Sequence, residues 1–376
     1  MDQGTSRVDF ANTLRGIAAV CVLIAHYTAN FWRLRDAVAS LIHAPVLPEL
    51  FAFPVYLRWL HLTVPEFDWG AFGVALFFLV SGFVIPFSLR NATWQGFLVG
   101  RLFRIIPLYM AGFSITILSV WLVGRYFGVS WPFSVGEIAA HYIPGLRELF
   151  GMPSIDGIVW TLEIEIKFYL ICALAITWFQ RGSILVFAVP AALAACEFYM
   201  IRNGFGSTAL LPIPFLIFMF IGVVFHYLRA GALKPEKALF LGAGLFFLFS
   251  ILLGEAMPTL ASMAWTYGFA VVVFSFAASF PGLFRSTTIG NFFADISYPL
   301  YVIHGVAGYA ALRVLLDIGA KAWVSLIIVT VGAIGIAWLL HVSVEVPSHN
   351  FGRRLATRWR KPVVSQMPGR ASVPAE

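Results

Sequence analysis

The chain has 376 residues, of which 60% are hydrophobic and only 11% are charged, and its formal net charge is +7. Soluble globular proteins carry about 25% charged residues, so the composition argues against a soluble domain and predicts an integral membrane protein. Its mean hydropathy is +0.87. The positive charge is better explained by basic residues on the cytosolic face of a membrane protein than by binding of nucleic acid. The three cysteines have no metal-ligand spacing, which argues against disulfides and a zinc site.

Apolar stretches of about 20 residues, the length that crosses a bilayer as a helix, recur along almost the whole chain. We therefore predict an all-α fold, a polytopic membrane helical bundle of about ten transmembrane helices in one domain. The expected spans are residues 12–31, 71–89, 105–124, 160–179, 184–201, 210–228, 238–256, 261–280, 297–316 and 323–344.

Basic residues set the expected orientation of these spans. If the N-terminus is cytosolic, sixteen of the 25 Lys and Arg residues fall on the cytosolic side and eight on the outer side, while Lys167 lies within a span. The positive-inside rule then places both termini in the cytosol. Two outer connections, 32–70 and 125–159, are long and rich in aromatic residues, which predicts folded caps or interfacial pieces. The chain from residue 353 to 376 is basic and then rich in Pro and Ser, which predicts a disordered cytosolic tail.

The first span carries a polar pair. Arg15 and His26 are separated by ten residues that are all apolar or glycine. Eleven helical steps of about 100° make roughly three turns, so both side chains point in the same direction and lie roughly 16 Å apart along the axis. Ionisable side chains inside a membrane span are rare and mark functional sites. Arg15 alone could snorkel to the interface, but His26 lies too deep for that.

Further polar residues occur in later spans. Arg101 and Arg104 are three residues apart and share a helix face, and paired guanidinium groups suit phosphate oxygens. Glu163 and Lys167 have the spacing of an ion pair within one helix. Glu165 points to another face and needs a cation, a proton or a substrate.

Two more residues complete the polar set. His304 lies in the ninth expected span, with a packing role and a polar role equally open. Glu345 ends the tenth, at the depth of Arg15, and is a candidate partner for it. Among these candidate residues no His and acid are four apart on one helix, so we predict that there is no metal.

Taken in order, these residues and their neighbours resemble the acyltransferase 3 family, ten-span membrane O-acyltransferases that modify bacterial surface and exported carbohydrates. The resemblance rests on motifs from residue 9 to about 350: Arg15 to His26, Gly73–Phe83 with Ser81, Arg101-Leu-Phe-Arg104, Trp160–Tyr169 with Glu165, Ser297–His304, and Val-Glu345-Val-Pro. It implies an acyltransferase domain over residues 1–352.

The resemblance also implies roles. His26, Arg15 and Glu165 would be the catalytic residues, and Arg101 and Arg104 would bind the phosphates of acyl-CoA, expected to be acetyl-CoA. The family's frequent acidic residue three positions before the arginine is Asn12 here. Its second acid after Glu165 is also absent, since Glu165-Ile-Lys167 stands where Glu-Glu-Gln is usual, which questions a two-carboxylate mechanism.

We therefore expect an O-acyltransferase of the bacterial cytoplasmic (inner) membrane, with both termini cytosolic. It would move an acyl group from cytosolic acyl-CoA to a carbohydrate hydroxyl, and the acceptor would be a surface polysaccharide, such as lipopolysaccharide or exopolysaccharide, or a glycolipid. His26 would act as general base or as nucleophile. The alternatives are a transporter or translocator without transferase activity, and a polymerising or succinyl-transferring relative. No nucleic acid is expected as a partner.

Overall fold

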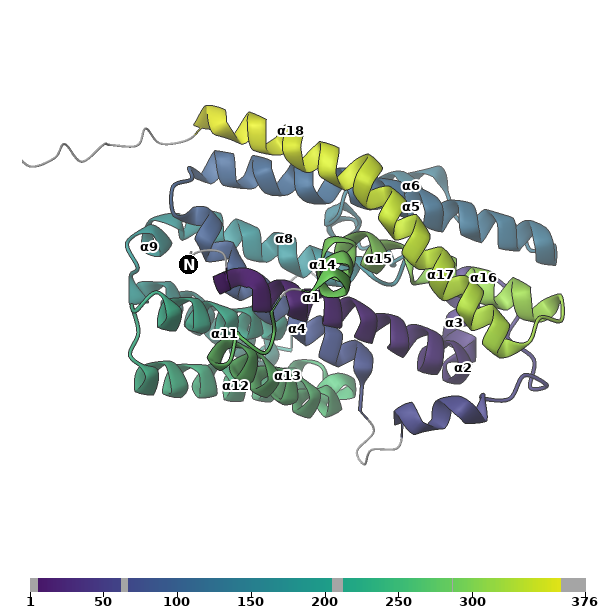
Figure 1. Ribbon diagram of the computed structural model, residues 1–376, viewed down its shortest axis with the longest axis horizontal. Helices are drawn as coiled ribbons and strands as arrows, with labels where there is room; N and C mark the ends of the chain where they lie inside the picture. The colour runs from purple at the N-terminus through teal and green to yellow at the C-terminus, as the bar shows by residue number, and fades with distance from the viewer. Residues whose placement is uncertain (1–5, 62–66, 205–211, 286, 360–376) are drawn as a thin grey trace, which may run out of the picture.

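The computed structural model describes residues 6–61, 67–204, 212–285 and 287–359, and the secondary structure in these ranges is helical, without strands (Figure 1). This confirms the predicted all-α fold. Each expected span coincides with a helix or a pair of consecutive helices. The longer helices are α1 (Ser6–Ala25), α4 (Trp69–Leu89), α5 (Trp94–Phe127), α8 (Val159–Leu174), α10 (Ala188–Arg202), α11 (Ile213–Arg229), α12 (Pro235–Ala256), α13 (Ala264–Ser279), α16 (Val306–Asp317), α17 (Ala322–Leu340) and α18 (Val346–Ala356).

Seven helical stretches in the described residues are long and apolar enough to cross a membrane. An eighth is formed if α15 (Ser297–Ile303) and α16, which meet at an angle of 57°, count as one broken span. The two other expected spans correspond to α8 and α11, which have 16 and 17 residues and are shorter than a full crossing. Residues 210 and 211 of the expected span 210–228 lie outside the described residues. The chain is thus a multi-pass membrane protein.

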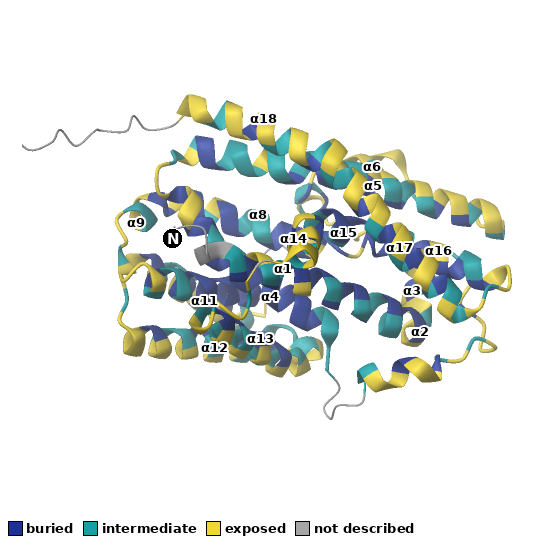
Figure 2. Ribbon diagram, in the orientation of Figure 1, coloured by how far each residue is buried: buried dark blue, intermediate teal, exposed yellow. Residues whose placement is uncertain are grey.

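Helix α4 lies at the centre of the bundle. In its most apolar window 72% of the residues are buried, against at most 28% for the stretches that contain α10, α12, α13 and α17. Figure 2 shows the same contrast, since α4 is dark blue and the outer faces of α12 and α13 are yellow. Those outer faces carry exposed aromatic and aliphatic side chains such as Phe240, Phe247 and Phe276. Large apolar side chains on the periphery are what a helix facing lipid requires.

Small residues allow α4 to contact its neighbours closely. A Cβ atom on Gly222 of α11 would lie 2.3 Å from the carbonyl oxygen of Leu79, and one on Gly73 would lie 2.6 Å from the carbonyl oxygen of Ala18 in α1. Such contacts between backbones are the usual device for packing helices in membranes, where van der Waals contact drives association. They hold α1, α4 and α11 together as the core of the bundle.

Three of the places where regular helix is interrupted in the described residues concern the predicted site. The π-helical segment η1 (His26–Asn30) follows α1, and a second one, η5 (His341–Glu345), joins α17 to α18. The third interruption is the bend between α15 and α16, at residues 304 and 305. Each interruption contains one of the predicted site residues, His26, His304 or Glu345. Single turns of π-helix frequently occur at functional sites.

The two long connections contain short helices, among them α2 (Phe31–Arg33), α3 (Arg35–Ile42), α6 (Val135–His141) and α7 (Leu146–Leu149). Short helices also lie elsewhere, at α9 (Ile176–Gln180) and α14 (Thr288–Asp295).

The predicted start of the tail at residue 353 falls inside α18, which continues to Ala356 and ends in a 3₁₀ turn at Thr357–Trp359. Arg353 and Arg354 lie in the last turn of α18, where cations interact favourably with the helix dipole. Residues 360–376, the rest of the predicted tail, lie outside the described residues.

The contact between α4 and α11 can be tested at Gly222. We expect Gly222→Ala to destabilise the purified protein by about 1–3 kcal/mol, because the added methyl group cannot fit without displacing backbone. The measurement is thermal unfolding in detergent, followed by intrinsic tryptophan fluorescence.

The matched control is Gly244→Ala on α12, where an added Cβ meets nothing within 4 Å. That substitution should be neutral or stabilising, because alanine favours helix by up to about 1 kcal/mol over glycine. Equal melting temperatures for both variants would contradict the packing described here.

Candidate functional site

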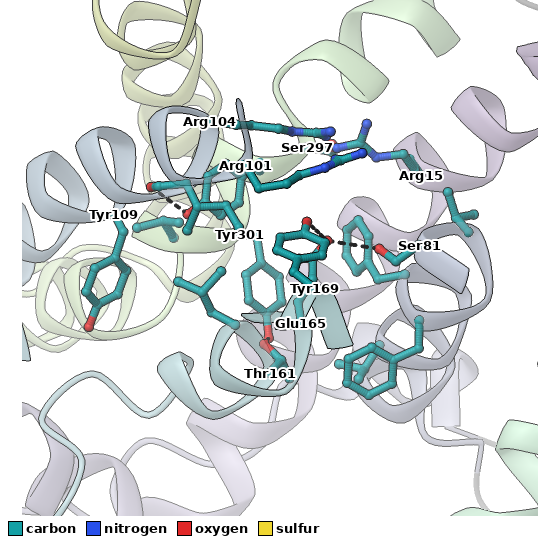
Figure 3. Close-up of a pocket in the computed structure, with 18 of the residues that line it drawn as sticks. Arg15, Ser81, Arg101, Arg104, Tyr109, Thr161, Glu165, Tyr169, Ser297 and Tyr301 are labelled. Carbon is teal, nitrogen blue, oxygen red and sulfur yellow. Dashed lines mark hydrogen bonds between the residues drawn. The ribbon is translucent and has the colours of Figure 1, made fainter. Parts of the chain in front are cut away.

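Five of the predicted site residues come together in one cavity of about 90 Å³. They come from four helices that are far apart in sequence and are drawn together in Figure 3. The cavity is closed on a further side by α15, through Ser297, Tyr298 and Tyr301. The five predicted residues are Arg15 from α1, Ser81 from α4, Arg101 and Arg104 from α5, and Glu165 from α8.

Glu165 is held by two hydroxyl groups. The hydroxyls of Ser81 and Tyr169 donate hydrogen bonds to its Oε1, at 3.0 and 2.5 Å (Figure 3). Oε2 takes part in neither bond. Tyr169 lies one helical turn after Glu165 on α8, so both face the cavity. Tyr169 was not among the predicted site residues, although its spacing of four residues from Glu165 places both on one helix face.

Three guanidinium groups face this carboxylate. Arg15, Arg101 and Arg104 converge on one wall of the cavity (Figure 3). Arg101 donates a hydrogen bond to Ser88 (2.9 Å), and its guanidinium lies 5.2 Å from the centre of the Tyr169 ring. Among the described residues, no carboxylate lies within 4.0 Å of any of the three guanidinium groups in an ion pair. The cavity therefore has an excess of positive charge and is suited to an anionic group.

His26 lies outside this cavity. Its Nδ1 is joined to the Tyr309 hydroxyl by a hydrogen bond of 2.6 Å, and its ring meets the ring of His304 edge-on, with 4.6 Å between the ring centres. Nothing in the sequence pointed to Tyr309. A hydrogen bond at Nδ1 orients the ring and leaves Nε2 as the nitrogen available for proton transfer or attack.

His304 is buried, and its protonation is fixed by the backbone. Its Nδ1 donates to the carbonyl oxygens of Tyr301 and Leu300, at 2.7 and 3.1 Å. Since a carbonyl only accepts, Nδ1 carries the proton and Nε2 of the neutral ring is an acceptor. No described residue hydrogen-bonds that Nε2. His304 therefore contributes a polar neighbour to His26, with its Nδ1 proton held by the backbone.

Tyr301 connects the two parts of the site. Its side chain lines the cavity, and its ring centre lies 5.6 Å from that of His304. Its hydroxyl is hydrogen-bonded to the Thr161 hydroxyl at 2.6 Å. Tyr301 and His304 thus lie between the cavity and His26, so the predicted residues form a cavity with a histidine pair behind one wall.

Two predicted partnerships are corrected by the structure. Glu345 pairs with His341, whose Nδ1 lies 2.8 Å from its Oε2, rather than with Arg15. The charge of Glu345 still acts on the Arg15 guanidinium, as does that of Glu165. The second correction concerns Glu163 and Lys167, which do not pair with each other.

Glu163 and Lys167 are instead bound by the outer loop. Arg147 pairs with Glu163 at 2.5 Å, and Glu148 pairs with Lys167 at 2.6 Å. Both loop residues belong to α7. An ion pair within one exposed helix contributes only about 0.2–0.5 kcal/mol. The ion pairs with Arg147 and Glu148, whose side chains are buried against α8, therefore form in place of a pair between Glu163 and Lys167.

The start of α8 is fixed by Asp156. Its Oδ1 accepts the backbone N–H groups of Ile158 and Val159, and its Oδ2 accepts the hydroxyl of Tyr109, which lines the cavity. Burial raises the pKa of the Asp156 carboxyl, while its bonds from Val159 and Tyr109 oppose that rise. This carboxyl sets where α8 begins and therefore where Glu165 lies.

In the described part of the chain, no group of three or more His, Cys, Asp or Glu side chains is arranged to hold a metal ion. The site residues are arginines, carboxylates, hydroxyls and imidazoles. Such a set can bind an anionic substrate, polarise it and transfer a proton.

Comparison with known proteins gives two matches. A family model described as an acyltransferase domain matches residues 8–342, a range that contains all the predicted site residues except Glu345. Nodulation protein 10 of Rhizobium leguminosarum bv. viciae is 28% identical over 178 residues, which cover 40% of this chain and 47% of that protein. The chain thus matches about half the length of this curated relative. No solved structure matches the chain.

The corrected ion pairs can be separated by double-mutant cycles. We expect Arg147→Met to destabilise the protein by about 3–5 kcal/mol, because it leaves the buried Glu163 carboxylate without its partner. The double variant Arg147→Met/Glu163→Gln should recover part of this loss. The measurement is the unfolding free energy of each variant in detergent.

The control cycle pairs Glu163→Gln with Lys167→Met. Because these two side chains form ion pairs with different residues of α7, their coupling should be clearly smaller than that between Arg147 and Glu163. A strong coupling between Glu163 and Lys167 would show that the predicted pairing within the helix was right after all.

Proposed function

Because the chain belongs to the acyltransferase 3 family, we propose that it is a membrane O-acyltransferase that transfers an acyl group, expected to be acetyl, from cytosolic acyl-CoA to a hydroxyl of a cell-surface or exported carbohydrate. The orientation with both termini in the cytosol belongs to the same proposal. It places the mouth of the bundle near Arg101 and Arg104 on the side of the donor.

The observation that supports the donor is the charge of the cavity. Arg15, Arg101 and Arg104 face one carboxylate, Glu165, inside an apolar bundle. An acyl-CoA carries several phosphate charges, and guanidinium groups bind phosphate oxygens with paired hydrogen bonds. The arginines of α5 would hold the phosphates nearest to the thioester.

His26 would carry the chemistry in one of two ways. As general base, its Nε2 takes the proton of the acceptor hydroxyl while the oxygen attacks the thioester carbonyl. The C–S bond then breaks, and the departing sulfur receives the proton. As nucleophile, Nε2 attacks the thioester carbonyl first, the C–S bond breaks and the sulfur leaves as the thiolate. The acceptor hydroxyl then takes the acyl group from Nε2, and its proton goes to the thiolate. The Tyr309 bond to Nδ1 supports either role, because it orients the ring.

Glu165 would serve the acceptor. Its Oε1 is occupied by Ser81 and Tyr169, so Oε2 is the atom that would accept a hydrogen bond from a sugar hydroxyl. In either route the acyl group has to pass Tyr301, whose hydroxyl is held by Thr161. Losing one such neutral hydrogen bond costs only about 0.5–1.5 kcal/mol net, so this side chain can move within a catalytic cycle.

The transferase proposal is tested with His26→Ala. Purified protein in lipid nanodiscs is given acetyl-CoA and a carbohydrate acceptor, and release of free CoA and acylation of the acceptor are followed together. We expect the variant to lose at least about 10²-fold in rate, the lower end of what a general base contributes. Binding of acetyl-CoA should be retained.

The two other outcomes are informative. A correctly folded His26→Ala variant that transfers at the wild-type rate would remove His26 from the mechanism. A wild-type protein that moves a labelled glycolipid between leaflets, but never transfers an acyl group, would instead favour the translocator.

The donor is tested with the double variant Arg101→Ala/Arg104→Ala. We expect its affinity for acetyl-CoA to fall by about 10²-fold or more, because a hydrogen bond to a charged group contributes about 1.5–3 kcal/mol. The measurement is isothermal titration calorimetry at fixed salt.

Arg125→Ala is the matched control, because Arg125 is an exposed arginine at the other end of the same helix. It should bind acetyl-CoA as the wild type does. If the double variant also binds normally, the two arginines do not hold the donor.

A further inference from the structure

A second cleft adjoins the cavity and is much larger. Its volume is about 600 Å³, and it lies between the turn that joins α4 to α5 and the helix α18. Arg101 and Arg104 line both spaces, so the two meet at these side chains. We call it the α18 cleft. Its ionisable lining residues are Arg90, Arg101, Arg104, His349 and Arg353.

The α18 cleft is positively charged throughout. No Asp or Glu is among its described lining residues. The charges of Arg104, Arg353 and Arg101 all act on the His349 side chain, so the cations share one field. Such a concentration of like charge opposes folding unless an anion occupies it. The lining therefore favours a ligand with several negative charges.

Helix α18 is held firmly against α5, which places its basic residues (Figure 1). A Cβ on Gly352 would lie 2.4 Å from the Cβ of Phe103, so only glycine allows this approach. Beyond the helix, the Thr93 hydroxyl donates to the carbonyl oxygen of Trp359 at 2.6 Å. Arg353 and His349 are thus fixed parts of a wall, and they lie beyond the range 8–342 that the acyltransferase model matches.

The cavity and the α18 cleft differ in volume and therefore suit different parts of a ligand. Pockets for molecules of drug size measure about 300–1,000 Å³. The cavity at Glu165, at about 90 Å³, has room for an acyl group and its thioester but not for a nucleotide. The α18 cleft, at about 600 Å³, has that room. It also presents aromatic side chains, Phe87 and Trp359 among them, on which a base can stack.

We propose that the α18 cleft binds the phosphorylated adenosine end of the acyl-CoA donor. Arg90, Arg353 and His349 hold its phosphates, and Arg101 and Arg104 stand where the donor passes from the cleft into the cavity. This proposal rests on the proposed function, because it requires acyl-CoA as the donor. It gives the C-terminal helix a binding role in place of a general contact with lipid.

The test uses adenosine 3′,5′-bisphosphate, a fragment of the donor that has no acyl group. In nanodiscs of zwitterionic lipid, the wild type should bind it and acetyl-CoA in competition. Arg353→Ala should weaken both ligands by about tenfold or more, the loss expected for one hydrogen bond to a charged group. His349→Ala should weaken both as well and provides a second, independent variant.

The matched control is Arg354→Ala. Arg354 is the next residue on α18 and is also exposed, but it is not part of the cleft. It should bind both ligands as the wild type does. Because Arg353 and Arg354 carry the same charge in the same turn, a general effect of positive charge on α18 would lower the affinity in both variants.

The outcomes distinguish this proposal from the function on which it rests. A wild type that binds no acetyl-CoA overturns the proposed donor. A wild type that binds acetyl-CoA, with Arg353→Ala equal to Arg354→Ala, overturns only the role of α18. The proposal also fails if Arg353→Ala leaves both nucleotides unaffected but releases anionic phospholipid that copurifies with the wild type, because the cleft would then hold a lipid headgroup.

Discussion

The excess of guanidinium groups over carboxylates is the constraint on which the rest of the structure depends. Arg15, Arg101 and Arg104 lie on one wall inside an apolar bundle, opposite Glu165. In a medium of low dielectric constant an uncompensated charge is strongly unfavourable, so such residues persist only where they face a cavity, a partner or a ligand. That cavity lies where α1, α4, α5, α8 and α15 meet, and the close approach of α1 to α4 at Gly73 brings two of its walls together.

Irregular backbone marks the same region. His26 opens one π-helical segment, Glu345 closes another, and His304 lies at the bend between two half-helices. A π-turn or a bend changes the direction in which the following side chains point, and membrane proteins tolerate it only where the freed backbone groups find partners. Here the Tyr27 hydroxyl donates to the carbonyl oxygen of His304. The irregular turns place the histidines together, although they are far apart in sequence.

The apolar periodicity of the sequence, and the free-energy cost of polar residues inside a membrane, predicted the features that depend on single helices. The expected spans coincide with helices, and five of the predicted site residues line one cavity, with His26 and His304 behind one of its walls. The predictions that were wrong concern features that depend on tertiary contacts. The spacing of Glu163 and Lys167 predicted an ion pair, but α7 supplies a better partner to each from a loop whose path no local pattern encodes. The basic residues after 352 predicted a tail, because nothing local shows that Gly352 lets α18 pack against Phe103. Tyr309 was not predicted as a site residue, because a tyrosine in an apolar span is not in itself unusual.

Helix α8 links the outer loop to the cavity through its two faces. Residues two apart on a helix point about 200° away from each other, so Glu163 and Lys167 face α7 while Glu165, between them, faces the arginines. The outer loop therefore binds α8 through Glu163 and Lys167, which lie two residues before and two residues after Glu165. Besides Asp156, Arg147 and Glu148 hold α8 from the outer side, and Ser81 and Tyr169 hold the Glu165 carboxylate within the cavity. A movement of the outer loop would thus reach the cavity directly, through a rigid helix, without a chain of intermediate residues.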